Sequence, residues 1–143
     1  MVSALLIFAV TATASLAMDN GSSTEPALRK TQLPPISKIT IRNSGAKSPA
    51  SNEPTEQCAD FKLSYQEIRE YISKAAEVAE HDYFHMLDWS PCHASGELAF
   101  RSGVTGIWAI QQYRAGSLKL SDGRTMYLYC PRCKAKAFPP AND

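Results

Sequence analysis

Apolar residues recur at the spacing of an α-helix in the middle of the chain. The stripe consists of Ile68, Ile72, Ala75 and Ala79, widened by Tyr71 and Val78. Ser64 and Glu67 have the spacing of a capping box, in which each side chain bonds the backbone amide of the other residue. Leu63 and Ile68 occupy the two positions of a hydrophobic staple. We therefore expect an amphipathic helix from about Tyr65 to Tyr83.

Beyond Pro91 the apolar period changes to two, which is typical of β-strands. The expected strands are 97–101, 104–113, 117–120 and 125–130. Short turn signals separate them, namely Ser102-Gly103, Ala115-Gly116 and Asp122-Gly123. Three short connections in a row predict an antiparallel meander. The predicted fold class is α+β: one N-terminal amphipathic helix packed on a four-stranded antiparallel β-meander and cross-linked by disulfides.

The start of the chain has the pattern of an export signal. Leu5–Val10 is an apolar run, and residues 14–17 end in the small-x-small pattern that signal peptidases accept, although no Lys or Arg precedes the run. The run is too short to span a bilayer, which needs about 20 apolar residues. We predict a signal peptide over 1–17 and a protein of the periplasm or the exterior.

The next segment, 18–57, has the composition of a linker. It contains no Phe, Trp or Tyr, whereas Pro, Ser, Asn and Glu are frequent. We predict a disordered linker over 18–57, followed by a disulfide-stabilised α+β domain over 58–143. Within the linker, Ile36–Arg42 alternates as a strand does. It is either an extended part of the linker or a strand that adds to a sheet edge, here or in a partner.

The four cysteines are Cys58, Cys92, Cys130 and Cys133. In an exported protein they form two disulfides, and three pairings are open. We favour the two crossed pairings, in which one of Cys58 and Cys92 bonds Cys130 and the other bonds Cys133, because these bonds close long loops. In every pairing Cys58 and Cys92 must lie within about 15–20 Å of each other. The segments that flank the helix must therefore fold back along it.

Two other interpretations of the cysteines remain open. Cys130-Pro-Arg-Cys133 resembles half of a zinc knuckle, so a zinc site would use Cys92, Cys130, Cys133 and either Cys58 or a His such as His93. A second C-x-x-C is missing, and export argues against free thiolates. A C-x-x-C thiol–disulfide enzyme is the weaker alternative, because the first Cys of such an enzyme opens a helix.

Catalytic motifs are absent from the sequence. It contains no G-x-S-x-G motif and no glycine-rich loop that leads from a strand into a helix. His81 and His85 have a spacing that can hold a metal, but the end of a helix also favours His through its dipole. We therefore predict no enzyme, no metal site and no cofactor.

The net charge of +1 is a cancellation between two regions. Residues 60–88 carry seven acids and three bases, giving −4, and residues 97–136 carry seven bases and two acids, giving +5. Such polarity either balances within the molecule or attracts a partner. It is not the basic stripe of a nucleic-acid binder. The predicted partner-binding residues are Trp108, Tyr113, Arg114, Arg124, Tyr127 and Tyr129.

A set of positions over about 58–133 carries a resemblance to known proteins. The set consists of Tyr83-Phe-His-x3-Trp89-Ser-Pro-Cys92, Gly103-x4-Trp108-x-Ile110, Gly116, Asp122-Gly123 and Tyr129-Cys-x2-Cys133. It resembles small exported proteins of Gram-negative bacteria, and some proteins of that kind are immunity proteins against type VI secretion effectors. Export, a small disulfide-bonded domain, the lack of a catalytic set and a polarised surface predict a periplasmic protein-binding or inhibitor protein, and the resemblance implies that its partner is a protein such as a cognate toxin. The resemblance assigns no site residues. The short apolar run, with no Cys directly after it, predicts no membrane contact after signal cleavage.

Overall fold

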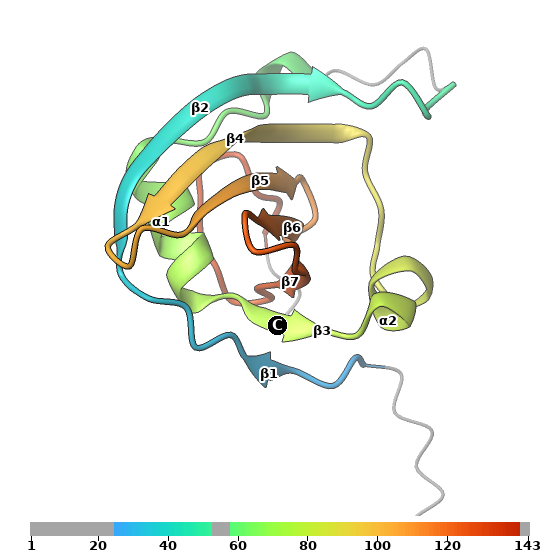
Figure 1. The fold of residues 1–143 in the computed structure, drawn as a ribbon. Helices are drawn as coiled ribbons and strands as arrows, with labels where there is room; N and C mark the ends of the chain where they lie inside the picture. Colours follow the sequence, from blue (N-terminus) through green and yellow to red (C-terminus); the bar gives the residue numbers. More distant parts are fainter. Residues whose placement is uncertain (1–24, 53–57, 141–143) are drawn as a thin grey trace, which may run out of the picture.

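The computed structural model describes residues 25–52 and 58–140, which form one seven-stranded sheet curved around a helix (Figure 1). The elements are β1 (Arg29–Lys30), β2 (Ile36–Lys47), the 3-10 turn η1 (Cys58–Asp60), α1 (Tyr65–Lys74), β3 (Ala76–Val78), α2 (Glu80–His85), β4 (Cys92–Phe100), β5 (Thr105–Gln111), β6 (Ala115–Leu120) and β7 (Thr125–Tyr129). The predicted α+β class is confirmed. The single helix and the four strands are wrong.

The sheet order is β1-β3-β7-β6-β5-β4-β2, and every neighbouring pair is antiparallel. The predicted meander is the central run β4–β7. Strand β2 adds to the meander beyond β4, and β3 followed by β1 adds beyond β7. Both ends of the sheet are therefore built by residues that precede the meander in the chain.

Two of the three predicted turns are confirmed. Gly103 and Gly123 lie in the turns after β4 and β6, with φ of 91° and 94°, where glycine avoids the steric cost of a side chain. The turn predicted at Ala115-Gly116 is wrong, because both residues are already in β6. The chain turns instead just before them, where Arg114 has φ of 69° and its amide donates to the Gln111 carbonyl at 3.1 Å.

Helix α1 begins as predicted and ends much earlier. The Ser64 amide donates to the Glu67 carboxylate at 2.7 Å, and the Glu67 amide donates to the Ser64 hydroxyl at 3.1 Å. The helix stops at Lys74, because Ala75 takes an extended conformation with ψ of 142°. The next residues pair with β7, so their backbone hydrogen bonds go to the sheet rather than to another helical turn. The predicted helix to Tyr83 is therefore two helices separated by a strand.

The core lies between α1 and the inner face of the curved sheet. It is centred on the fully buried side chains Ile68, Tyr71, Ile72, Trp108, Ile110, Leu118 and Leu128. Gly116 allows the helix to approach closely, because an added Cβ would lie 2.7 Å from the Ala109 carbonyl oxygen and 2.9 Å from Tyr71 Oη. Helix α2 lies outside this core, and none of its residues is fully buried, although Tyr83 is partly covered.

Both disulfides are present, but the favoured crossed pairing is wrong. Cys58 bonds Cys92 and Cys130 bonds Cys133. Cys58 and Cys92 meet because η1 lies against β2, whose residue Lys47 is opposite Cys92 in the sheet. Their Cα atoms are 4.8 Å apart, so the expected proximity of the two helix flanks is confirmed. The Cys133 amide donates to the Cys130 carbonyl at 3.1 Å, which closes a tight turn after β7.

The disorder predicted for 18–57 does not hold over residues 25–52. This segment contains β1 and β2, and β2 pairs with β4 along nearly its whole length. Ile39 is buried in the core, and Ile36 and Ile41 pack against it. The burial of these apolar side chains thus offsets the ordering cost of a segment that is otherwise polar. The predicted signal peptide 1–17 and residues 18–24 and 53–57 lie outside the described residues.

Candidate functional site

An aromatic cluster forms where α2 packs on the outer face of the sheet. Tyr127 is on this face, as the alternation in β7 predicts, because Met126 and Leu128 are buried on the inner face. The Tyr83 ring lies 4.8 Å and the Phe84 ring 5.4 Å from the Tyr127 ring, measured between centroids. We call Tyr83, Phe84 and Tyr127 the aromatic cluster.

The cluster is held in place yet leaves one ring exposed. The Tyr127 hydroxyl donates to the Glu80 carboxylate at 3.1 Å, and Tyr83 contacts Phe84 edge-on at 5.1 Å. Burial raises the pKa of Tyr83, and the nearby Tyr127 raises it further, so the ring stays neutral well into the alkaline range. Phe84 is 60% exposed. An ordered apolar ring is therefore presented to solvent.

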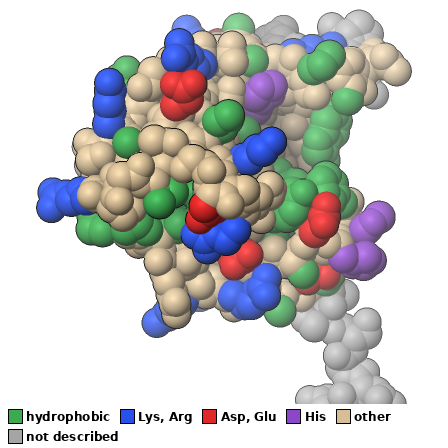
Figure 2. Space-filling view, viewed as in Figure 1, with side chains coloured by type: hydrophobic (Ala, Val, Ile, Leu, Met, Phe, Trp, Pro, Cys, Tyr) green, Lys and Arg blue, Asp and Glu red, His purple; other side chains and the backbone are tan. Residues whose placement is uncertain are grey.

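Trp89, in the loop that joins α2 to β4, and Tyr113, in the turn between β5 and β6, form a second pair of aromatic residues. The buried Gln111 side chain donates to the Asp88 carbonyl at 2.8 Å and accepts from the Tyr113 amide at 3.0 Å. This clamp holds the backbone beside Trp89 next to the backbone of Tyr113. The two side chains are 58% and 41% exposed. Figure 2 shows hydrophobic side chains gathered over α2 and this loop, beside histidines.

A hollow of about 1320 Å³ adjoins this loop. It lies between the segment before β1, the α2–β4 loop and the chain after β7. Its apolar lining includes Leu28, Met86, Leu87, Phe138 and Pro139. Its charged lining consists of Lys74, Arg114, Arg132 and Lys134 against Glu25 and Asp88. Four cations and two anions give a net charge of +2, and we call this site the basic hollow.

Arg114 builds one wall of the basic hollow. Its Nε donates to the Cys133 carbonyl at 2.9 Å and its Nη2 donates to the Pro139 carbonyl at 2.6 Å. Its guanidinium carbon lies 5.2 Å from the centroid of the Phe138 ring, which permits a cation–π contact. Arg114 was predicted to bind a partner. It is half-buried and holds the C-terminal segment against the sheet.

The six predicted partner-binding residues do not form one surface. Tyr113 and Tyr127 belong to the surface described above, and Tyr129 lines the basic hollow. Trp108 is fully buried and its Nε1 donates to the Glu97 carbonyl at 3.1 Å, so the prediction that it contacts a partner is wrong. The face of β5 that carries Trp108 packs into the core. Arg124 lies at the opposite end of β7 from Tyr129.

Sequence reasoning missed the exposed residues of α2 and of the loop after it. Phe84 and Trp89 fall between the end of the predicted helix at Tyr83 and the first predicted strand, where no element was expected. A usable signal was present, because 83–89 places three large aromatic residues where neither a helical nor a strand period continues. Met86 and Leu87, which line the basic hollow, lie in the same stretch.

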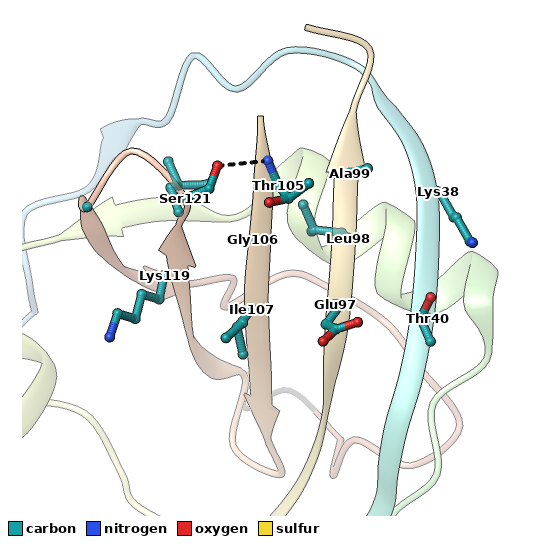
Figure 3. A pocket seen from close by; sticks show the side chains of 12 residues that line it. Lys38, Thr40, Glu97, Leu98, Ala99, Thr105, Gly106, Ile107, Lys119 and Ser121 are labelled. Atoms are coloured by element: carbon teal, nitrogen blue, oxygen red, sulfur yellow. Dashed lines mark hydrogen bonds between the residues drawn. The ribbon is translucent and has the colours of Figure 1, made fainter. Parts of the chain in front are cut away.

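A second hollow, of about 710 Å³, lies on the outer face of the sheet (Figure 3). Sheet register aligns the side chains of Thr40, Glu97, Ile107 and Lys119 across four strands. The Glu97 carboxylate accepts from Arg42 at 3.0 Å, and the Ser121 hydroxyl accepts from the Thr105 amide at 3.1 Å. Much of its polar lining is therefore already bonded within the protein.

The cysteines and histidines of the metal-site and thiol-enzyme alternatives are all placed by the structure. All four cysteines are in disulfides, so none of them is a free thiolate. The His81 and His85 rings lie 4.6 Å apart on exposed turns of α2. Within residues 25–52 and 58–140, no three His, Cys, Asp or Glu side chains come close enough together to hold a metal ion.

Comparison with known proteins assigns no family. No protein-family model matches the chain, and no curated protein or solved structure matches it significantly. Among the described residues, no helix has both the length and the apolar character needed to cross a membrane.

Proposed function

We propose that the protein binds and inhibits another protein in the periplasm or outside the cell, as an immunity protein neutralises a secreted toxin. The surface that binds the partner consists of the aromatic cluster, Trp89, Tyr113 and the adjoining basic hollow. The observation that carries the proposal is the exposure of Phe84 and Trp89, by 60% and 58%, at one end of a small domain. Exposed apolar surface with a charged rim is typical of protein-binding sites.

The composition of this surface supports the proposal. Tyr, Trp, Phe, Met and Arg are the residue types enriched in interfaces, and a few such side chains carry most of the binding energy. The rings of the aromatic cluster contact one another, and the Gln111 clamp orders the backbone beside Trp89. A surface ordered before binding loses less conformational entropy on association.

The two disulfides support the proposed location. Disulfides persist in the periplasm and outside the cell, where thiols are oxidised. The Cys58–Cys92 bond joins residues separated by 34 positions, so it constrains much of the unfolded chain. A small inhibitor that works outside the cytoplasm benefits from such a constraint.

Capture of the partner tests the proposal. The full chain is expressed with its own leader in a Gram-negative host, together with the product of the adjacent gene, and purified under oxidising conditions. We expect a stable complex, and we expect co-expression to restore growth if the neighbour is toxic. Phe84→Ala and Trp89→Ala should each weaken the complex at least about 10-fold, because hot-spot residues contribute about 2 kcal/mol.

The matched control is Tyr65→Ala. Tyr65 is equally exposed but lies on α1, which packs on the other face of the sheet. Its substitution should change affinity less than twofold, and circular dichroism should show all three variants folded. Repeated failure of the wild-type chain to retain any partner, or equal weakening by Tyr65→Ala, would contradict the proposal.

A further inference from the structure

We infer that the basic hollow binds an acidic segment of the partner, in which carboxylates alternate with apolar side chains. This inference rests on the proposed function, because the hollow adjoins the aromatic surface through Met86 and Leu87. It adds the chemistry of the partner, which the exposed aromatic residues by themselves do not define. The second hollow, on the outer face of the sheet, is the alternative location for such a segment, and we call it the outer-face hollow.

The charges of the hollow select carboxylates. Its net charge of +2 contrasts with the +1 of the whole chain. Lys74 lies 3.7 Å from Glu70 and is partly neutralised, so the cations that act on a ligand are Arg114 and the exposed Arg132 and Lys134, against the anions Glu25 and Asp88. Cations at a rim attract an acidic segment during encounter and disfavour a basic one. Arg132 can also bind a carboxylate through two parallel hydrogen bonds.

The apolar lining selects side chains that accompany the carboxylates. Met86, Leu87 and Pro139 line the hollow together with Leu28, which is half-exposed. Methionine adapts its shape to different partners, and the proline ring loses little entropy when covered. An apolar side chain of the partner would bury area against these residues, whereas a purely acidic segment would not.

The C-terminal wall of the hollow is formed before binding. Arg114 donates to carbonyls at Cys133 and Pro139, and the Lys136 amide donates to the Glu67 carboxylate at 3.2 Å. Phe138 is anchored in the core, with its ring 6.1 Å from the Phe61 ring. The Cys130–Cys133 bond closes the turn at the base of this wall. Arg132 and Lys134 therefore project from an ordered segment.

The outer-face hollow is a weaker candidate for the same ligand. Its two lysines, Lys38 and Lys119 (Figure 3), match the charge of Arg132 and Lys134, and its acid Glu97 is bound to Arg42, so the difference between the hollows lies in their apolar lining. Its central apolar side chain, Ile107, is a single exposed residue on a sheet surface. Each hollow thus has two cationic side chains that can be substituted, Arg132 and Lys134 in one and Lys38 and Lys119 in the other, but only the basic hollow has an extended apolar lining.

Fluorescence anisotropy with synthetic peptides tests the inference. The probe is a labelled 12-residue peptide of alternating Glu and Leu, and the comparison peptides replace every Glu by Gln or by Lys. With the oxidised full chain we expect the Glu peptide to bind at least 10-fold more tightly than the Gln peptide, and the Lys peptide more weakly still. Raising the salt concentration should weaken the Glu peptide, because the contacts are between charges.

Charge-reversal variants locate the site. Arg132→Glu with Lys134→Glu should weaken the Glu peptide at least 10-fold, whereas Lys38→Glu with Lys119→Glu, the same change of net charge, should weaken it less than twofold. Equal weakening by the two double variants, or equal affinity for the Glu and Gln peptides, would overturn the inference. Absence of binding by the Glu peptide would also overturn it.

The same variants separate this inference from the proposed function. If Arg132→Glu with Lys134→Glu leaves the captured partner bound while Phe84→Ala releases it, the inference fails and the proposed function stands. If no partner is retained by the wild-type chain although the Glu peptide binds the hollow, the proposed function fails and the hollow remains a peptide site.

Discussion

At the scale of single residues, Tyr71 links the helix to the sheet. Its hydroxyl donates to the Arg114 carbonyl at 2.8 Å and lies 3.4 Å from the Leu128 carbonyl. Burial raises the pKa of Tyr71 well above its ordinary value of 10, and the neighbouring Tyr83 and Tyr129 raise it further. One fully buried hydroxyl thus connects α1 to the turn before β6 and to β7.

We predict that Tyr71→Phe lowers the free energy of unfolding at pH 8 by about 1 kcal/mol, the usual net value of a hydrogen bond. The unfolded tyrosine releases its proton near pH 10, whereas the folded one keeps it. The contribution of Tyr71 is therefore complete below pH 10 and is lost as the pH rises toward the folded pKa. Urea unfolding at pH 8 and pH 10.5 should show a smaller alkaline loss in the variant.

The matched control is Tyr65→Phe, because Tyr65 is exposed on the same helix. Tyr65→Phe should leave the free energy of unfolding at pH 8 and its decrease at pH 10.5 the same as in the wild type. An alkaline loss as large in Tyr71→Phe as in the wild type would show that other groups cause it.

At the scale of elements, α1 is defined by its N-terminal cap and by the strand that follows it. Burial acts to raise the pKa of Glu67, but hydrogen bonds from Ser64 and from the Lys136 amide outweigh it, so this pKa is lowered. The same carboxylate thus caps the helix and fixes the C-terminal segment. Ala75 leaves the helix because β3 finds its backbone partners in β7. A local signal begins the helix, and a distant strand ends it.

We predict that Glu67→Gln lowers the free energy of unfolding at pH 7 by about 1 kcal/mol, because Gln can still accept from the Ser64 amide but hydrogen bonds to a charged group are stronger than those to a neutral one. The stabilisation from a lowered pKa is present above the ordinary value of 4.5 and is lost as the pH falls through the folded value. The difference between wild type and variant should therefore shrink on acidification. Thermal unfolding at pH 7 and pH 3 measures it.

Glu70→Gln serves as the control, because the Glu70 carboxylate contacts only side chains of its own helix, accepting from Gln66 at 3.2 Å and pairing with Lys74 at 3.7 Å in the structure described. Its effect at pH 7 should stay below about 0.5 kcal/mol. A difference for Glu67→Gln that is the same at both pH values would mean that its charge is not what stabilises the cap.

At the scale of the whole molecule, the domain includes the segment that its composition assigns to a linker. Strand β2 forms one edge of the sheet and β1 forms the other. Residues 25–52 therefore supply both edge strands of the sheet. Residues 60–88, which carry a net charge of −4, and residues 97–136, which carry +5, lie within this single body. Their opposite charges also separate on the surface, where Arg132 and Lys134 reach the rim of the basic hollow.

We predict that a fragment of residues 58–143 is less stable than one of residues 25–143 by at least about 3 kcal/mol. Removal of β2 takes Ile39 from the core and uncovers the edge of β4, and a buried Ile contributes about 1.5–3 kcal/mol. Circular dichroism melting of both fragments, with the Cys58–Cys92 bond verified by mass spectrometry, measures the difference. Equal melting temperatures would restore the linker interpretation.

The amino-acid sequence by itself determines the features that depend on near neighbours. The capping box begins α1, alternation and two turn signals define β4–β7, and the same alternation puts Tyr127 on the face opposite Leu128. Each of these signals acts over a few residues, so it can be recognised without knowing the partner. The export pattern belongs to the same class and remains a prediction.

Tertiary structure alone decides the rest. The end of α1, the edge strands, the disulfide pairing and the meeting of Phe84 with Tyr127 all join residues that are far apart in the chain. Local propensity favours a longer helix and a disordered linker, but buried apolar area and sheet hydrogen bonds gained over long distances outweigh it. The candidate surface depends on the same long-range contacts, which is why its two most exposed rings were not predicted from the sequence.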